Sequence, residues 1–428
     1  MSRIKIKNFG PIRDGFVEND GWMDVKKVTV LIGDQGSGKS TVAKLISLFT
    51  WLEKNIIRNS VSTEQLNAVV FKNLCFQQEL IEYFTPNTFL KFEGDSYDFE
   101  YIESEQSFVL KKNENNNNCY VLPKIQYVSA ARNLLTILYN ISLQNIVDKN
   151  GNIIDMSSNI PFMVKELNKE YMKALQELAK DGFALPINDT SVFFQEHSAF
   201  IVTQGKRVSM SAASSGIQSI TPLLLVSHFL SEKVRENIFD KIQYIDNNLK
   251  NRIEDELSKV SGELSDKFKQ LYSFGKGILS IEEDVSLLES TLKQFIPSSF
   301  INIVEEPEQN LFPNSQQKVI NSLIEYNNAI KENKLIISTH SPYILSALNN
   351  SILAEEAFEK TGRSIDSYGP EKRVAFDDVS AYLLEDGKIY NIKDDETRLI
   401  KAEAIDNCSD EINSDFDSLL DLIPDNED

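Results

Sequence analysis

The residues best suited to chemistry form a glycine-rich loop, Gly33-Asp34-Gln35-Gly36-Ser37-Gly38-Lys39-Ser40. An apolar run at residues 28–32 precedes the loop, and a helix-prone run at residues 41–46 follows it. A strand, a glycine-rich turn and a helix N-terminus in this order direct backbone N–H groups and the helix dipole at anionic oxygens. Because both neighbouring elements are present, we interpret the loop as a phosphate-binding P-loop and not as a chance match.

Within this loop, Lys39 is expected to reach the β and γ oxygens of ATP, and the hydroxyl of Ser40 to bind Mg²⁺. The three glycines allow the backbone to curl around the phosphates without Cβ clashes. Thr41 borders the loop and is expected mainly to pack. The predicted nucleotide site therefore comprises residues 33–41.

A second group of functional residues follows the apolar run at residues 300–304, where the sequence reads Glu305-Glu306-Pro307-Glu308. Carboxylates after a buried strand are costly unless they serve a cation. This is a Walker B arrangement, in which Glu305 is expected to hold Mg²⁺ or its water. Glu306 is expected to act as the general base that takes a proton from the attacking water.

A histidine ends the next buried run, residues 335–339. His340 stands where a P-loop sheet has its active-site edge, so we expect it to contact the γ-phosphate or to order the attacking water. The two other histidines, His197 and His228, lie in patterned strand and helix and are expected to be structural or surface residues.

Two weaker patterns each have two interpretations. Ser215-Gly216 with Gln218 stands at a predicted helix N-terminus, which indicates either a second anion site or an ordinary serine N-cap. Arg132 follows a predicted strand and Ser129, so it is either a γ-phosphate or inter-lobe contact, or a surface arginine after a helix N-cap.

The composition excludes several classes of protein. The chain has 428 residues, of which 41% are hydrophobic, and a net charge of −20. This acidity argues against a protein that is mainly a nucleic-acid-binding surface, although a local basic groove is not excluded. Cys75, Cys119 and Cys408 have neither metal-ligand nor disulfide-framework spacing. The sequence shows neither a secretion signal nor an apolar run long enough to span a membrane, so we expect a cytoplasmic protein.

An apolar stripe in residues 242–271 has steps that average about 3.6 residues, the period of a straight α-helix. A two-stranded coiled coil would have a period of about 3.5. We therefore expect one long amphipathic helix that lies on a body or on another subunit. This helix and the region beyond Val374 are the candidate docking surfaces, and the acidic tail after residue 401 is expected to be solvated.

In this order the motifs resemble the soluble ABC-type ATPases of the OLD, RecF and SMC-like group, over residues 4 to about 345. Residues 6–12 and 305–313 also look like that group. The resemblance implies an α/β fold of the P-loop NTPase type, with a mixed sheet flanked by helices, an antiparallel edge and helical insertions. Two departures are Glu305 in place of the usual aspartate and Phe312 where relatives often have histidine.

The resemblance also implies roles and boundaries. Ser215 and Gly216 become a signature motif acting on nucleotide in another subunit, residues 309–312 a D-loop, and His340 the switch histidine, with Gln126 or Arg132 as the Q-loop. The implied division is an ATPase core at residues 1–60 and 299–400, an inserted lobe at 61–210, a signature helix at 211–230, a helical insertion at 231–298 and a tail at 401–428.

Within this group the sequence most resembles the ATPase subunits of PARIS-type anti-phage defence systems, with Septu-type ATPases as a near alternative. This resemblance implies an ATP-driven switch that forms a homo-oligomer with head-to-tail nucleotide sites, controls a separate TOPRIM or HNH effector nuclease and responds to a phage-encoded trigger. The alternative is a DNA repair or maintenance ATPase of the RecF or SMC-like type that binds DNA directly. The acidic net charge favours the first.

Overall fold

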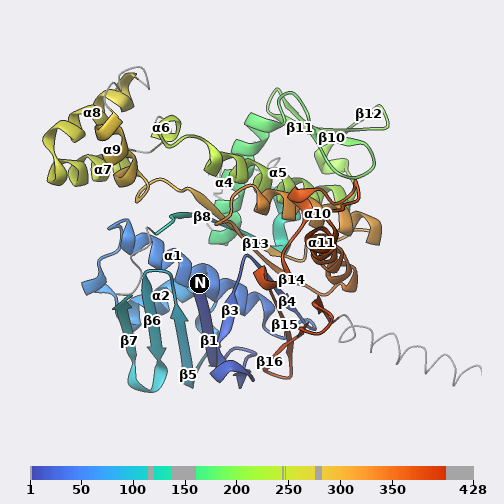
Figure 1. Ribbon diagram of the computed structural model, residues 1–428, viewed down its shortest axis with the longest axis horizontal. Helices are drawn as coiled ribbons and strands as arrows, with labels where there is room; N and C mark the ends of the chain where they lie inside the picture. Colours follow the sequence, from blue (N-terminus) through green and yellow to red (C-terminus); the bar gives the residue numbers. More distant parts are fainter. Residues whose placement is uncertain are drawn as a thin grey trace, which may run out of the picture.

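The computed structural model describes residues 2–113, 120–136, 161–242, 245, 247–274 and 282–401 (Figure 1). The asparagine run from Asn113 to Asn118 predicts a solvated hairpin tip, and Gly151-Asn152 predicts a turn. Residues 114–118, this turn and the acidic tail after residue 401 lie outside the described residues.

The main sheet has seven strands in the order β2-β16-β15-β4-β14-β13-β8. The strands from β15 to β8 are all parallel, so their carboxyl ends meet at one edge. This edge is where ligands bind in open α/β sheets. The strands are β2 (Gly15–Phe16), β4 (Val28–Ile32), β8 (Pro123–Val128), β13 (Ser299–Glu305), β14 (Lys334–Thr339), β15 (Val379–Glu385) and β16 (Lys388–Asn391).

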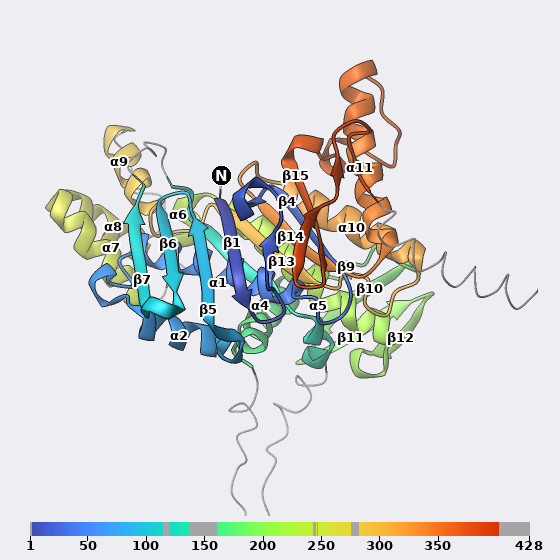
Figure 2. The same cartoon turned by 90° about the horizontal axis from the view of Figure 1, so that it is seen from below.

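A second, antiparallel sheet has the order β3-β1-β5-β6-β7. Figure 2 shows it with α1 and α2 behind it. The expected antiparallel edge is therefore present. Its strands are β1 (Ser2–Phe9), β3 (Met23–Val25), β5 (Phe84–Glu93), β6 (Tyr97–Ile102) and β7 (Ser107–Lys112).

These pairings contradict the single inserted lobe predicted for residues 61–210. Strands β5 to β7 extend the sheet that β1 begins, and β8 is an edge strand of the main sheet. Strand pairing joins segments far apart in the chain, and no local pattern shows it. Beyond Val374, β15 pairs with β4 inside the main sheet and β16 pairs with β15, as the core assignment of residues 299–400 implied; docking by this region remains a prediction.

Helix α1 (Lys39–Ile57) lies between the two sheets and extends well beyond the helix-prone run at residues 41–46. Its Phe49 stacks on Phe71 of α2 (Ala68–Gln77) and on Phe92 of β5, with ring centroids 5.5 and 5.3 Å apart. A 3-10 turn precedes α2 at Thr63–Gln65, and another follows it at Ile81–Tyr83. A buried core holds α1 in a constant position relative to both sheets.

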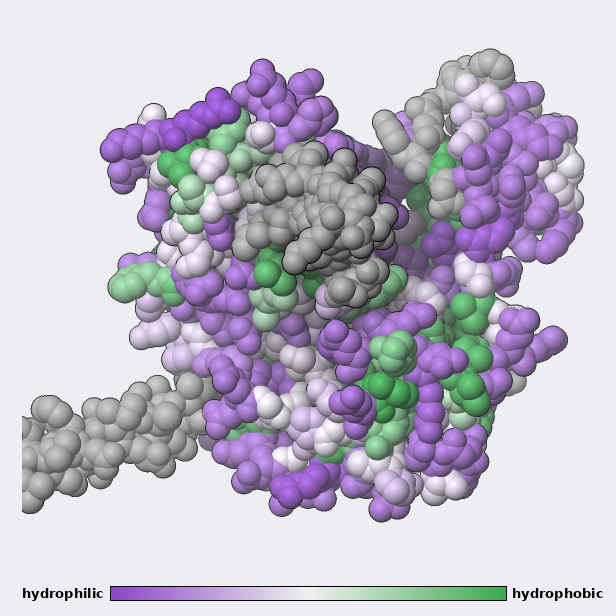
Figure 3. Space-filling view, turned by 180° about the vertical axis from the view of Figure 1, so that it is seen from behind, coloured by the Kyte–Doolittle hydropathy of each residue, from purple (hydrophilic) through white to green (hydrophobic). Residues whose placement is uncertain are grey.

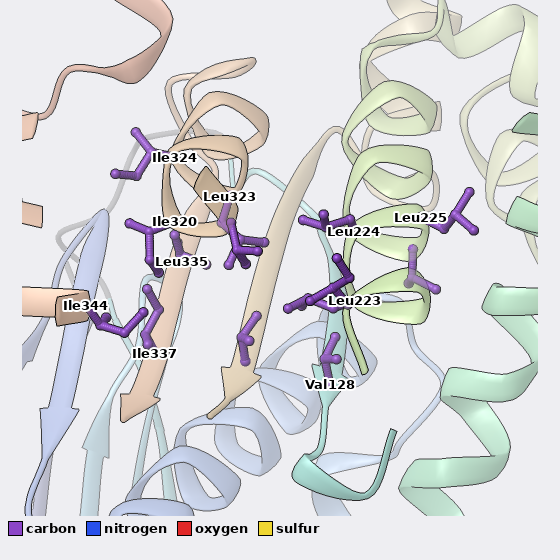
Figure 4. Packing of buried hydrophobic residues seen from close by; sticks show 14 of the residues in the cluster. Val128, Leu223, Leu224, Leu225, Ile320, Leu323, Ile324, Leu335, Ile337 and Ile344 are labelled. Carbon is purple, nitrogen blue, oxygen red and sulfur yellow. The ribbon is translucent and has the colours of Figure 1, made fainter. Parts of the chain in front are cut away.

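The opposite face of the main sheet is covered by α4 (Phe162–Leu178), α5 (Ser215–Arg235), α10 (Pro313–Asn328) and α11 (Pro342–Thr361). Figure 4 shows Ile320 and Leu323 of α10 beside Leu335 and Ile337, and Leu223 and Leu224 of α5 nearer Val128, all in one buried cluster. Alternate residues of a strand face opposite sides, so Leu335 and Ile337 join this core while Ile336 joins the core around α1. Each fully buried aliphatic side chain contributes about 1.5–3 kcal/mol.

Residues 183–209 form a small sheet in the order β12-β11-β10-β9. These strands are β9 (Phe183–Ala184), β10 (Thr190–Gln195), β11 (Ser198–Thr203) and β12 (Lys206–Ser209). Beyond the main sheet, β17 (Lys393–Asp394) pairs with β18 (Leu399–Ile400). The face seen in Figure 3 is mainly hydrophilic, with hydrophobic residues in small separate spots.

The single long helix predicted over residues 242–271 is wrong. The segment forms α7 (Asn247–Val260) and α8 (Gly262–Phe274), with α6 (Ile238–Lys241) before them and α9 (Glu282–Leu292) after them. The hydroxyl of Ser265 donates to the carbonyl of Glu254 at 3.4 Å, which a straight helix, rising 1.5 Å per residue, could not allow. The apolar side chains of the stripe are buried in a small separate hydrophobic core. Gly262, which has a low helix propensity, stands where the helix breaks.

Candidate functional site

The glycine-rich loop joins β4 to α1 at the carboxyl edge of the main sheet. Gly33, Gly36 and Gly38 have φ of 146°, 78° and 105°. A Cβ atom on Gly33 would lie 2.2 Å from the carbonyl oxygen of Leu384. Gly38 is the N-cap of α1 and offers no side-chain cap, so the amides of the first turn remain directed at the loop. This cradle suits an anionic ligand.

Lys39 is almost fully buried at the base of this loop. Its Nζ donates to the carbonyls of Gly33 and Asp34, both at 2.7 Å, and lies 3.5 Å from Nδ1 of His340. Burial lowers the pKa of Lys39, while Glu306 and Asp34 act in the opposite direction. The amino group is thus held by the loop's own carbonyls, next to the positions that phosphates would take.

The residues beside Lys39 differ in access to solvent. Ser40 is exposed, so its hydroxyl is open to a metal ion, whereas Thr41 is 3% exposed and packs as expected. The Oγ atom of Ser37 is buried and has no hydrogen-bond partner among the described residues. An orphaned hydroxyl inside the loop is consistent with a ligand that the loop is built to receive.

Glu305 ends β13 and is 8% exposed. One carboxylate oxygen accepts a hydrogen bond from the hydroxyl of Tyr127 at 2.6 Å, and the other accepts one from the amide of Ala130 at 3.0 Å. Burial, and then the charge of Glu305, raise the pKa of Tyr127, which keeps it a donor. Each oxygen retains further acceptor capacity. Tyr127 was not predicted as a site residue, since nothing near it in the chain indicates a partner 178 residues away.

Glu306 follows with a left-handed φ of 44°. Its side chain is partly exposed, and Oε1 lies 3.5 Å from Nε2 of His340. The imidazole of His340 therefore lies between Glu306 and Lys39. The structure brings together these three predicted site residues from three separate parts of the chain; their roles remain predictions.

Glu308, to which the sequence analysis gave no individual role, anchors the histidine. Its Oε1 accepts hydrogen bonds from the backbone amide of His340 at 2.7 Å and from the hydroxyl of Thr339 at 2.8 Å. Its Oε2 is buried without a hydrogen-bond partner among the described residues. The signal available in the sequence was its place as the third carboxylate after β13.

Arg132 is completely buried in the 3-10 helix η5 (Ala130–Asn133) that follows β8. Its guanidinium donates to backbone carbonyls from the end of β13, from the start of η5 and from α5. A surface position is therefore excluded, and a γ-phosphate contact is not supported because the side chain is enclosed. The side chain instead joins the end of β13 to η5 and α5, and an inter-lobe role remains a prediction. The acceptors are Ser219 at 3.1 Å, Ser129 at 3.2 Å, and Glu305 and Glu306 at 2.6 Å each.

Gln126 is not brought to the site. It is 4% exposed in the middle of β8, where it pairs in register with Asn302, three residues before Glu305. Its side chain borders a cavity of about 200 Å³ beside Ser47 and Leu48 of α1, well beyond the first turn of that helix. The proposed Q-loop role for Gln126 is therefore wrong.

The start of α5 packs on the predicted D-loop of the same chain. A Cβ atom on Gly216 would lie 2.7 Å from the carbonyl oxygen of Asn310, and the hydroxyl of Ser219 donates to Gln309 at 3.0 Å. Ser215 is exposed, and Ser214 makes no side-chain cap. The simple N-cap interpretation thus fails, while action on a neighbouring subunit remains a prediction.

Gln218 has a local role instead of a ligand contact. Its amide nitrogen donates to the carbonyls of Met210 and Ser211 at 3.1 and 3.0 Å, which fixes the turn before α5.

Within the described residues, no three His, Cys, Asp or Glu side chains form a ready metal site. A Mg²⁺ ion would therefore need ligands from bound phosphates in addition to Ser40 and Glu305, as is usual for this ion. No helix in the described part of the chain is long and apolar enough to cross a membrane.

Residues 1–345 match the model of a family described as an AAA ATPase domain. Curated proteins offer no significant match. Similar solved structures include the SMC head bound to the C-winged helix domain of ScpA, 9% identical with a TM-score of 0.37, where the match covers 91% of this chain and 96% of that chain. The SMC head domain from Thermotoga maritima is 10% identical, with a TM-score of 0.36 and coverage of 91% and 97%. An ATP-binding cassette of an ABC transporter in its ADP conformation is 14% identical, with a TM-score of 0.24 and coverage of 91% and 89%.

Proposed function

The chain belongs to the AAA ATPase domain family, and on this premise we propose that it binds ATP with Mg²⁺ and hydrolyses the ATP at sites shared between subunits. The α/β P-loop ATPase fold expected from the sequence is confirmed. One observation carries the proposal of hydrolysis: the ring of His340 lies 3.5 Å from both Lys39 and Glu306. A lysine suited to phosphate and a carboxylate suited to water thus face the same small volume.

The residues present fit ATP and Mg²⁺. The loop amides and Lys39 would hold the phosphates, and the exposed hydroxyl of Ser40 together with Glu305 would hold the metal or its water. When bound, Mg²⁺ neutralises charge on the phosphate oxygens. Glu306 would then accept the proton of the attacking water, while His340 orients that water or contacts the γ-phosphate.

We further propose that the ATPase is the cytoplasmic sensor and scaffold subunit of an anti-phage defence system of the PARIS type, like its ATPase subunit AriA. In this role it responds to a phage-encoded trigger and controls a separate effector nuclease. The net charge of −20 supports this role over direct DNA binding, which a RecF or SMC-like maintenance ATPase requires; a Septu-type defence ATPase is the nearer alternative.

Mixing two inactive variants tests the shared site. Lys39→Ala removes the phosphate contact, and Ser215→Arg places a bulky cation at the exposed start of α5. Ser215 is a better position for this substitution than the neighbouring Gly216, because a side chain at Gly216 would also displace Asn310 of its own chain. Mixed oligomers are expected to recover part of the ATPase activity, since some sites then have both halves intact. No recovery in well-mixed oligomers would contradict sites shared between subunits.

The defence role is tested with the purified chain and with cells. The protein alone is expected to hydrolyse ATP and to leave DNA and RNA uncut, and cells that express it without its effector are expected to be neither protected nor harmed. A nuclease activity that disappears in a point variant of this chain would overturn the proposal of a separate effector. Tight, salt-dependent DNA binding by the pure protein would instead favour the maintenance ATPase.

A further inference from the structure

We propose that Arg132 is a positioning residue that fixes the backbone of Glu306 and links it to helix α5. The inference rests on the proposed ATP hydrolysis and adds to it a path by which contacts at the start of α5 reach the general base. Arg132 is completely buried and so does not itself touch the nucleotide.

Glu306 has an unusual backbone conformation. Its φ of 44° is a left-handed conformation that residues with a Cβ atom seldom adopt. Three hydrogen bonds hold it there. Its amide donates to Ser338 at 2.8 Å, and its carbonyl accepts from Arg132 at 2.6 Å and from the amide of Gln309 at 3.0 Å. Without Arg132, the strained backbone of Glu306 would lose the only hydrogen bond that a side chain makes to it among the described residues.

The buried guanidinium of Arg132 makes an unusual set of hydrogen bonds. In the described part of the chain, the hydrogen bonds of Arg132 all go to backbone carbonyls and none to a carboxylate. A buried charge is costly unless it is satisfied. The planar guanidinium satisfies several carbonyls at fixed angles, which the compact amino group of a lysine cannot do. The site thus uses arginine for its geometry.

Arg132 also connects the segment after β13 to helix α5. Nε of Arg132 donates to the carbonyl of Ser219, and the hydroxyl of the same Ser219 donates to Gln309 in the segment after Glu306. The start of this helix also packs on Asn310. A shift of α5 would therefore move Arg132 and the segment after β13 together, and with them the carboxylate of Glu306.

The test is Arg132→Lys in the full chain, with ATP affinity and turnover measured separately. Because a misplacement of about 1 Å can cost about 10²-fold in rate, we expect kcat to fall by about 10²-fold while the Kd for ATP stays within about twofold. Arg373→Lys is the matched control. Arg373 is also buried, but it pairs with Glu355 and stacks on Phe358 far along α11, so this variant is expected to retain its kcat.

A double variant separates positioning from a general structural role. If Arg132 acts through Glu306, adding Arg132→Lys to Glu306→Gln will lower the residual turnover by less than about threefold. Equal losses of turnover from Arg132→Lys in both backgrounds, or a normal kcat in a folded Arg132→Lys variant, would overturn the inference. If the wild-type protein does not hydrolyse ATP at all, the proposed function itself fails, which is a different outcome.

Discussion

The two loops that build the nucleotide site are held in different ways. The P-loop is stabilised by its own residues: Lys39 donates to the carbonyls of Gly33 and Asp34, and the amide of Ser37 donates to Asp34. The end of β13 and the segment after it are stabilised from outside. Tyr127 of β8 and Arg132 after β8 contribute, as do Ser338 of β14, His340 after β14, and Ser219 of α5.

This difference indicates which parts of the molecule nucleotide binding and hydrolysis each depend on. A self-contained loop tolerates movement of its neighbours, so nucleotide binding is expected to depend mainly on local residues. A loop anchored by distant elements changes when any of them moves, so hydrolysis is expected to respond to the state of the assembly. Binding and hydrolysis should therefore separate in variants of the two loops.

The largest expected effect is the loss of turnover in Glu306→Gln. Glutamine preserves size but cannot accept a proton, so kcat is expected to fall by about 10²- to 10⁴-fold with ATP affinity retained. Lys39→Ala is expected to lose affinity instead, because it removes the cation at the phosphates. Calorimetric titration with ATP and a phosphate-release assay measure the two effects. Equal loss of affinity in both variants would contradict the separation of roles.

A smaller effect is expected when the P-loop glycines are compared with one another. Alanine in the left-handed region costs about 1–2 kcal/mol, and this is all that Gly36→Ala should cost, since its Cβ would meet nothing within 4 Å. Gly33→Ala adds a clash with the carbonyl of Leu384 and is expected to cost about 2–5 kcal/mol. Urea unfolding of both variants checks this, and similar losses would show that the loop relaxes more easily than its geometry indicates.

The smallest effect is expected at the far end of α1, where stability depends on pH. Burial raises the pKa of Glu53 to about 7. Because the unfolded chain ionises Glu53 at lower pH, the folded state is destabilised as pH rises from about 4.5 towards 7, and the loss is constant above that.

Glu53→Gln is expected to remove this dependence and to raise the free energy of unfolding at pH 8 by about 1–3 kcal/mol. The glutamine oxygen can still accept the amides of Ser96 and Tyr97. Urea unfolding at pH 5 and pH 8 measures the change. Turnover should not change, because Glu53 lies at the end of α1 remote from Lys39. An altered kcat would show that the P-loop is less self-contained than its hydrogen bonds indicate.

The sequence determined the parts of the site that depend on near neighbours. The P-loop glycines, the strand before them, the carboxylates after β13 and His340 were all predicted, because glycine spacing and strand patterns are local properties. The strand-like runs on either side of Asp386-Gly387 predict a hairpin for the same reason, and β15 and β16 form it.

Only the tertiary structure decided what connects these parts. Arg132 followed a strand in the sequence like a surface residue or a phosphate ligand, yet it binds carbonyls up to 174 residues away. Gln126 lies too far from the carboxyl end of β8 to reach the site. Only the pairing register with β13, which places it opposite Asn302, shows this. The stripe in residues 242–271 has the period of one helix, but a core that closes on itself buries more apolar surface than an extended rod could. The hydrophobic period shows which face of an element is buried, but not which other element covers that face. Long-range packing therefore decided these assignments.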